Sequence, residues 1–78
     1  MAARKQRPER DVDKDTGRKA FITKLRRLAD ALEEGKRFRL QVAGERISVP
    51  PNARISIEHE RDDEGEELEF QLSWKNDD

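Results

Sequence analysis

The chain contains no cysteine and little apolar material, and these shortages exclude several classes of protein. Without cysteine, no disulfide can support the fold, and neither thiolate catalysis nor a sulfur-bound metal centre can form. No apolar run approaches the ~18 residues of a membrane-spanning helix. The basic N-terminus is not followed by the apolar stretch of a secretory signal peptide. We therefore expect a cytosolic protein.

Composition alone nearly predicts disorder, because 32% of the residues are hydrophobic and 45% are charged. The net charge opposes that interpretation: 17 basic residues against 18 acidic ones leave −1, whereas disorder of this kind needs a high net charge. A chain of 78 residues has room for one core. We expect a disordered basic arm at residues 1–14, a single domain at 15–75 and a disordered tail at 76–78.

A helix is predicted after the arm. Asp15 or Thr16 can accept hydrogen bonds from the first free amides, and Gly35 is a suitable left-handed C-terminal residue. Between them, apolar residues recur at helical spacing and form one stripe. They are Ala20, Phe21, Leu25, Leu28, Ala29 and Leu32.

Alternation of apolar and polar residues predicts a first hairpin after Gly35. A two-residue loop of Gly44 and Glu45 pairs Val42 with Ile47, and this register keeps the apolar side chains on one face. Pro50-Pro51 ends the second strand, because proline cannot donate to a strand ladder.

A second hairpin is predicted from about residue 54 to residue 74. Ile55 and Ile57 point inward on its first strand, the turn at 61–65 uses Gly65 at positive φ, and the last strand alternates without a break up to Trp74, the only tryptophan. The predicted fold class is α+β: one N-terminal amphipathic helix packed on a four-stranded antiparallel meander, whose inward residues and the helix stripe form one core.

Charge is unevenly divided along the chain. Residues 1–39 carry 13 Lys and Arg against 7 Asp and Glu, and residues 40–78 carry 4 against 11. Such a dipolar surface either self-associates or presents one sign of charge to a partner, although charged runs are most often simply solvated.

Catalytic and metal-binding chemistry finds little support in the residues. His59 is the only histidine and lies near the end of a strand, where a metal site would need several convergent ligands. The four glycines are isolated, so no glycine-rich phosphate loop exists. The acidic run at 60–64 lacks the spacing of a calcium loop. We expect no enzyme, no metal site and no cofactor.

Two surfaces are candidates for binding. Cations on the arm and the helix could follow a phosphate backbone, although the acidic second half would repel nucleic acid and the sheet offers no aromatic pair for base stacking. These cations are Arg4, Lys5, Arg7, Arg10, Arg18, Lys19, Arg26 and Arg27. Trp74 either completes the core at the open end of the sheet or lines a hydrophobic notch for a ligand or peptide.

The helix end Lys24–Gly35 and the strand Leu68–Trp74, with Val49-Pro50 and Ile55–Glu58 between them, resemble the Amphi-Trp domain family of small prokaryotic proteins. The resemblance spans about residues 18–75. It implies the fold described above and supplies no catalytic residues.

We therefore expect a small non-enzymatic cytosolic binding module that engages a protein partner through its dipolar surface or by strand addition at a sheet edge. The alternative is a nucleic-acid-binding accessory protein that uses the basic arm and the helix. A homodimer that covers an edge strand also stays open, because the core of so short a chain is small.

Overall fold

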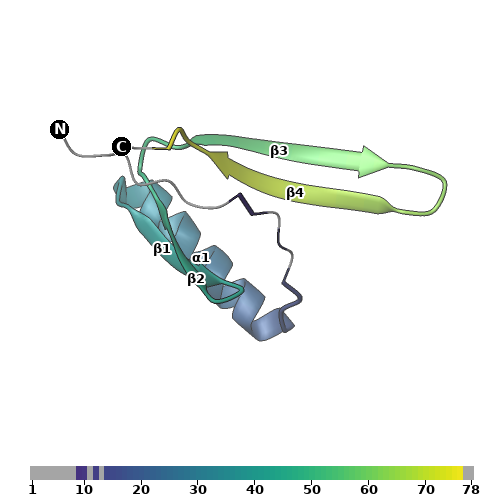
Figure 1. The fold of residues 1–78 in the computed structure, drawn as a ribbon, viewed down its shortest axis with the longest axis horizontal. Coiled ribbons are helices and arrows are strands. Elements are labelled where there is room, and N and C mark those ends of the chain that lie inside the picture. Colours follow the sequence, from purple (N-terminus) through teal and green to yellow (C-terminus); the bar gives the residue numbers. More distant parts are fainter. Residues whose placement is uncertain (1–8, 11, 13, 77–78) are drawn as a thin grey trace.

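The computed structural model describes residues 9–10, 12 and 14–76. Helix α1 (Arg18–Glu34) is followed by strands β1 (Phe38–Val42), β2 (Glu45–Val49), β3 (Arg54–Arg61) and β4 (Glu66–Ser73) (Figure 1). The predicted α+β class and the order of one helix and four antiparallel strands are confirmed. Most of the expected arm and the last two residues lie outside the described residues.

Helix α1 begins later than the sequence predicted. Its N-cap is Gly17, with extended φ and ψ of −64° and 152°, and no side chain accepts a hydrogen bond from the first turn. The prediction that Asp15 or Thr16 caps the helix was therefore wrong. The predicted C-terminus is confirmed: Gly35 is left-handed at φ 67°, its amide donates to Leu32 O, and the next amide donates to Ala31 O.

The first hairpin has a different turn from the predicted one. Val42 pairs with Glu45 and Leu40 with Ile47, so the two-residue loop is Ala43-Gly44 rather than Gly44-Glu45. Both loop residues have positive φ, 47° and 85°, as a type I′ turn requires, and this turn fits the twist of antiparallel strands. The pairing moves by two residues, so the apolar side chains stay on the predicted face.

The second hairpin is longer, and all eight residues of β3 pair with β4, from Arg54 with Ser73 to Arg61 with Glu66. Its turn is held by Asp62, whose carboxylate accepts hydrogen bonds from the amides of Glu64 and Gly65 at 2.8 and 3.0 Å. Gly65 does not have positive φ, contrary to the prediction, because the Asp62 side chain stabilises the turn instead.

The four strands form two separate two-stranded sheets, β1–β2 and β3–β4, rather than one continuous meander. Between them lies a turn that begins at Pro50, whose carbonyl accepts a hydrogen bond from the amide of Ala53 at 3.1 Å. Because neither proline can donate to a ladder, β3 leaves the first sheet instead of pairing with β2.

The core is much smaller than predicted. Helix α1 packs against β1, and among the described residues only Phe38 and Val49 are buried apolar side chains. The β3–β4 hairpin projects beyond this small body (Figure 1). The radius of gyration is accordingly 14.8 Å, against ~11.5 Å for a compact domain of this length. The described part of the chain contains no helix that is long and apolar enough to cross a membrane.

Candidate functional site

The two faces of the β3–β4 hairpin differ completely in chemistry. On one face, Ile55 pairs with Leu72 and Ile57 with Phe70, and further out His59 pairs with Leu68. Because side chains alternate along a strand, the intervening pairs occupy the opposite face. This opposite face is wholly polar in its central part, with Ser56 paired to Gln71 and Glu58 to Glu69.

Hydrogen bonds join the side chains on the polar face. Ser56 Oγ donates to Gln71 Oε1 at 3.2 Å, and Gln71 Nε2 donates to Glu58 Oε1 at 2.8 Å and to Glu69 Oε2 at 3.2 Å. The amide of Gln71 thus uses both its acceptor and its donors within the hairpin. This face is suited to water, and its side chains hold the two strands in register.

The apolar face of the same hairpin is largely uncovered. Ile55, Ile57, Leu68 and Phe70 keep 63–66% of their surface exposed. The prediction that Ile55 and Ile57 lie in the core was therefore wrong for this chain by itself, because the helix packs on the first hairpin and reaches only the base of the second. A two-stranded hairpin with one bare apolar face is marginal in water unless a helix or further strands cover it.

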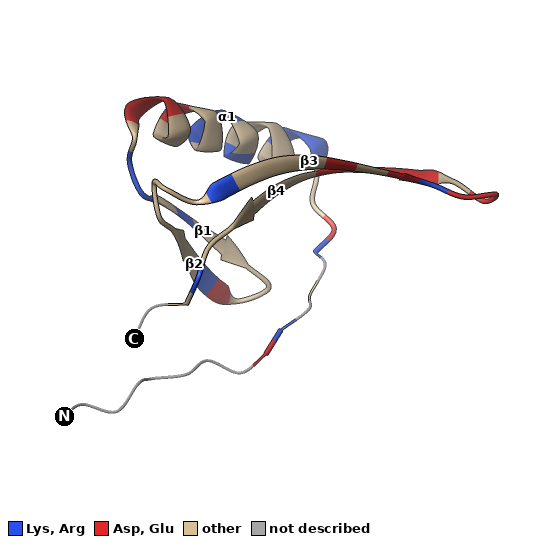
Figure 2. Cartoon of the chain, turned by 90° about the horizontal axis from the view of Figure 1, so that it is seen from above, with Lys and Arg blue, Asp and Glu red and all other residues tan. Residues whose placement is uncertain are grey.

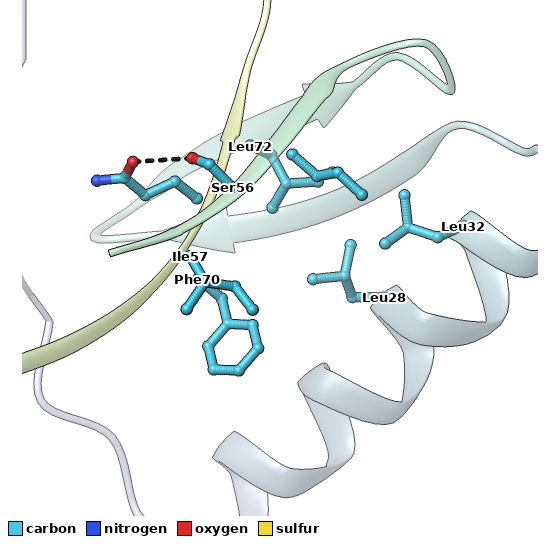
Figure 3. Close-up of a pocket in the computed structure, with 8 residues that line it drawn as sticks. Leu28, Leu32, Ser56, Ile57, Phe70 and Leu72 are labelled. Carbon is cyan, nitrogen blue, oxygen red and sulfur yellow. Dashed lines mark hydrogen bonds between the residues drawn. The ribbon is translucent and has the colours of Figure 1, made fainter. Parts of the chain in front are cut away.

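An open groove of about 440 Å³ separates this apolar face from α1. Figure 3 shows Leu28 and Leu32 projecting from the helix toward the hairpin, where Ile57, Phe70 and Leu72 line the other side. Ile55 completes the apolar lining, and Ser56 and Gln71 supply its few polar atoms. The groove is thus an apolar slot between two elements, with no charged side chain among its lining residues.

The apolar stripe of α1 continues past the groove toward the start of the helix. Phe21 is 55% exposed, and Ile22 and Leu25 are 40% exposed. Arg18 lies three and seven residues before Phe21 and Leu25, so it extends the same stripe with a positive charge. We call the exposed apolar residues of α1 and of the β3–β4 hairpin, together with the groove between them, the apolar surface.

Charges flank the apolar surface with opposite signs. Figure 2 shows cations on the first turns of the helix and mostly acidic residues toward the turn of the hairpin. The acidic residues are Glu58, Glu60, Asp62, Asp63, Glu64, Glu66, Glu67 and Glu69. The uneven charge that the sequence indicated therefore places cations on helix α1 and acidic residues on the β3–β4 hairpin, and both elements carry exposed apolar side chains.

Of the predicted cationic contacts, two bond to the first hairpin, three are exposed on the helix and three lie outside the described residues. Arg10 reaches the first hairpin, where it donates to Val42 O at 3.1 Å and lies 3.1 Å from a Glu45 carboxylate oxygen. Arg27 donates to Arg39 O at 3.1 Å. Arg18, Lys19 and Arg26 are exposed along the helix. The remaining predicted contacts, Arg4, Lys5 and Arg7, lie outside the described residues.

Trp74 follows β4 directly, at the base of the second hairpin. It keeps 39% of its surface exposed, so in the single chain it is not buried in a core, which was the first of its two expected roles, and it does not line the groove. Trp74 therefore lies next to the end of the turn that begins at Pro50, since Ser73 pairs with Arg54 immediately after that turn.

Potential acid–base and metal-binding groups are exposed on the hairpin. His59 Nε2 lies 2.9 Å from Glu66 Oε1, which also lies 3.1 Å from Arg61. On the other face, carboxylate oxygens of Glu60, Glu67 and Glu69 lie within 4.8 Å of one another. Exposed acidic clusters of this kind are common without a bound ion, and Glu69 already accepts a hydrogen bond from Gln71.

Comparison with known proteins supports the family suggested by the sequence. No curated protein and no solved structure matches the chain. The model of the Amphi-Trp domain family matches residues 5–78, nearly the whole chain and more than the stretch from 18 to 75 that the sequence pattern indicated. The chain belongs to the Amphi-Trp domain family.

Proposed function

We propose that this chain is a non-enzymatic cytosolic protein-interaction module that binds a protein partner through its apolar surface. The observation that carries the proposal is the exposure of Ile55, Ile57, Leu68 and Phe70 on one face of the second hairpin, opposite an exposed helix stripe. Contiguous exposed apolar surface on so small a domain is typical of an interaction site.

The chemistry of the groove supports binding rather than catalysis. Its lining supplies six apolar side chains, and the side chains of its two polar residues, Ser56 and Gln71, lie on the opposite face of the hairpin and bond to each other. His59 bonds Glu66 on an exposed part of the hairpin, away from any serine partner. A nucleophile and base in mutual contact, which acyl or phosphoryl transfer would need, do not occur among these hydrogen-bonded pairs.

Site-specific photo-crosslinking in the native cell tests the proposal. A photoreactive phenylalanine analogue at Phe70 reports on the apolar face, and the same analogue at Glu58, one residue pair away on the polar face, is the matched control. We expect a crosslinked protein product from position 70 and little or none from position 58. Equal products from both positions, or none from either, would contradict binding through the apolar surface.

A second candidate is nucleic-acid binding through the helix cations, favoured by the exposed positions of Arg18, Lys19 and Arg26. It predicts binding of an RNA or DNA oligonucleotide that falls steeply as salt rises and that is lost on deletion of residues 1–10. Binding that is absent at low salt would eliminate this candidate. Arg10 and Arg27 favour it less, because both already donate to backbone carbonyl oxygens of the first hairpin.

A further inference from the structure

We propose that the partner on the apolar surface is a second copy of this chain, so that the domain completes its core as a two-fold symmetric dimer. This inference rests on the proposed function, since it names the occupant of the same surface. In the dimer, the helix of each copy covers the outer half of the other copy's β3–β4 hairpin. The residues that meet are Phe21, Ile22 and Leu25 of one copy and Ile57, Leu68 and Phe70 of its partner.

The first argument is that helix α1 and the β3–β4 hairpin each expose an apolar face, and each could cover the face of the other. The hairpin needs a helix or further strands over its apolar face, and within one chain Leu28 and Leu32 reach only its base. The helix has an unpartnered apolar stripe in its first half. In a two-fold arrangement the same helix–hairpin contact forms twice, so the exposed helix stripe and the exposed hairpin face of both copies are covered.

The second argument concerns area. Seven aliphatic and aromatic side chains on the two elements are 40–66% exposed. At ~150–200 Å² each, they expose on the order of 600 Å² of apolar surface per copy. A stable interface buries about 800 Å² per partner, part of it a polar rim. The apolar surface thus supplies most of a dimer interface without any rearrangement of the chain. The seven residues are Phe21, Ile22, Leu25, Ile55, Ile57, Leu68 and Phe70.

The third argument is charge complementarity. The stripe on the helix ends at Arg18 with Lys19 beside it, whereas the hairpin is mostly acidic toward its turn (Figure 2). Of these carboxylates, Glu66 lies on the side of the apolar face, and Glu60 and Glu67 lie on the polar face at the same level. Helix against hairpin therefore brings the cationic start of one element near the acidic end of the other, whereas a hairpin-to-hairpin contact would bring like charges together. Complementary rims of this kind set the orientation of a complex.

Two other ways of covering the surface are less well supported. The first eight residues contain Arg4, Lys5 and Arg7 and only one large apolar residue, Met1, so they cannot cover an apolar face of this size. Closure of the hairpin on its own helix is opposed by the turn from Pro50, whose two prolines restrict φ between the hairpins. Both alternatives give a monomer, which the experiment distinguishes.

Sedimentation of the full chain tests the dimer directly. We expect a mass of twice 9.1 kDa at micromolar concentration. Phe70→Ser should weaken self-association at least ~30-fold, the loss expected for truncation of a buried interface anchor. The matched control is Arg39→Ser, an exposed change on the first hairpin that should leave the dimer intact. A monomer for the unmodified chain at all concentrations overturns the inference.

Charge reversal on the helix provides a second test. The variant Arg18→Glu with Lys19→Glu replaces the two cations that would lie near the partner's acidic hairpin, and both positions are exposed in the first turn of the helix. It should self-associate at least ~10-fold more weakly than the unmodified chain, since both copies of the contact then bring like charges together.

Unchanged self-association of this helix variant overturns the proposed arrangement. The proposed function fails separately: a crosslinked product of another mass at position 70 supports a different protein on the apolar surface even when the chain is a monomer. Equal crosslinked products at positions 70 and 58 would contradict binding through the apolar surface.

Discussion

The guanidinium of Arg27 lies over the ring of Phe38, 5.3 Å from its centroid, and joins helix α1 to the first hairpin. The same guanidinium donates a hydrogen bond to Arg39 O at 3.1 Å. Phe38 is one of two buried apolar side chains among the described residues and pairs across the hairpin with the other, Val49. A charged side chain on the helix therefore covers the small core instead of a further apolar residue.

Replacing Arg27 by alanine should lower the free energy of unfolding by about 1 kcal/mol, because the cation–π contact and the packing of the aliphatic stem are lost. Arg26→Ala is the matched control, since Arg26 is the exposed neighbour on the same helix. Urea denaturation at a fixed protein concentration measures both changes. Equal effects of the two substitutions would show that the contact with Phe38 contributes nothing.

Replacing Phe38 by alanine should cost ~3–5 kcal/mol, as truncation of a buried phenylalanine usually does. That is comparable to the total stability of a domain this small, so we expect the cooperative thermal transition to disappear. Arg39→Ala changes the adjacent, exposed position and should leave the transition in place. Circular dichroism during heating distinguishes these results, and a cooperative transition in Phe38→Ala would contradict the assignment of the core.

The type I′ turn of the first hairpin holds Ala43 at a φ of 47°, where a residue with a Cβ is strained. Asparagine tolerates this conformation better, so Ala43→Asn should stabilise the domain by ~0.5–1 kcal/mol. Gly44→Ala should destabilise it by about 1 kcal/mol through the backbone alone, because no atom lies within 4 Å of a Cβ added there. The midpoint of urea denaturation should shift in opposite directions for the two variants.

Helix α1 begins without a side-chain cap, and its first turn contains no acidic residue. Gly17→Asp places a carboxylate at the N-cap, where it can accept a hydrogen bond from a free amide and interact favourably with the helix dipole. Nothing lies within 4 Å of a Cβ at this position, and the backbone is already extended. We expect a gain of ~0.5 kcal/mol. Gly17→Ala, which adds a Cβ but no acceptor, should show no gain.

The local elements were predictable because their signals lie within short stretches of the chain. Gly35 ends the helix as expected, and the alternation from Glu67 to Trp74 identified β4 to within one residue at each end. The first turn was misassigned by one residue, since Gly44 can occupy either central position of a two-residue loop, and the choice depends on whether Ala43 accepts positive φ. The helix start was misassigned because Asp15 and Thr16 are equally suitable caps in sequence but lie outside the first turn.

The candidate site was only half predictable. Its residues were identified as apolar and assigned to the right faces, yet all of them were placed in a core. Low hydrophobic content was the available signal that one chain cannot bury so many faces, and Pro50-Pro51 was the signal that the sheet divides. The groove between Leu32 and Phe70 could not be inferred, since it depends on how far the second hairpin lies from the helix.

The sequence by itself determined one amphipathic helix, two hairpins and the face of each that is apolar, because 3.6-residue and two-residue periods are local properties of the backbone. Only the tertiary structure decided which of these faces cover one another. The turn from Pro50 separates the hairpins, the helix packs on the first one, and Ile57 and Phe70 on the second stay exposed. Packing between distant segments depends on the path of the chain, and that path leaves apolar surface available to a partner.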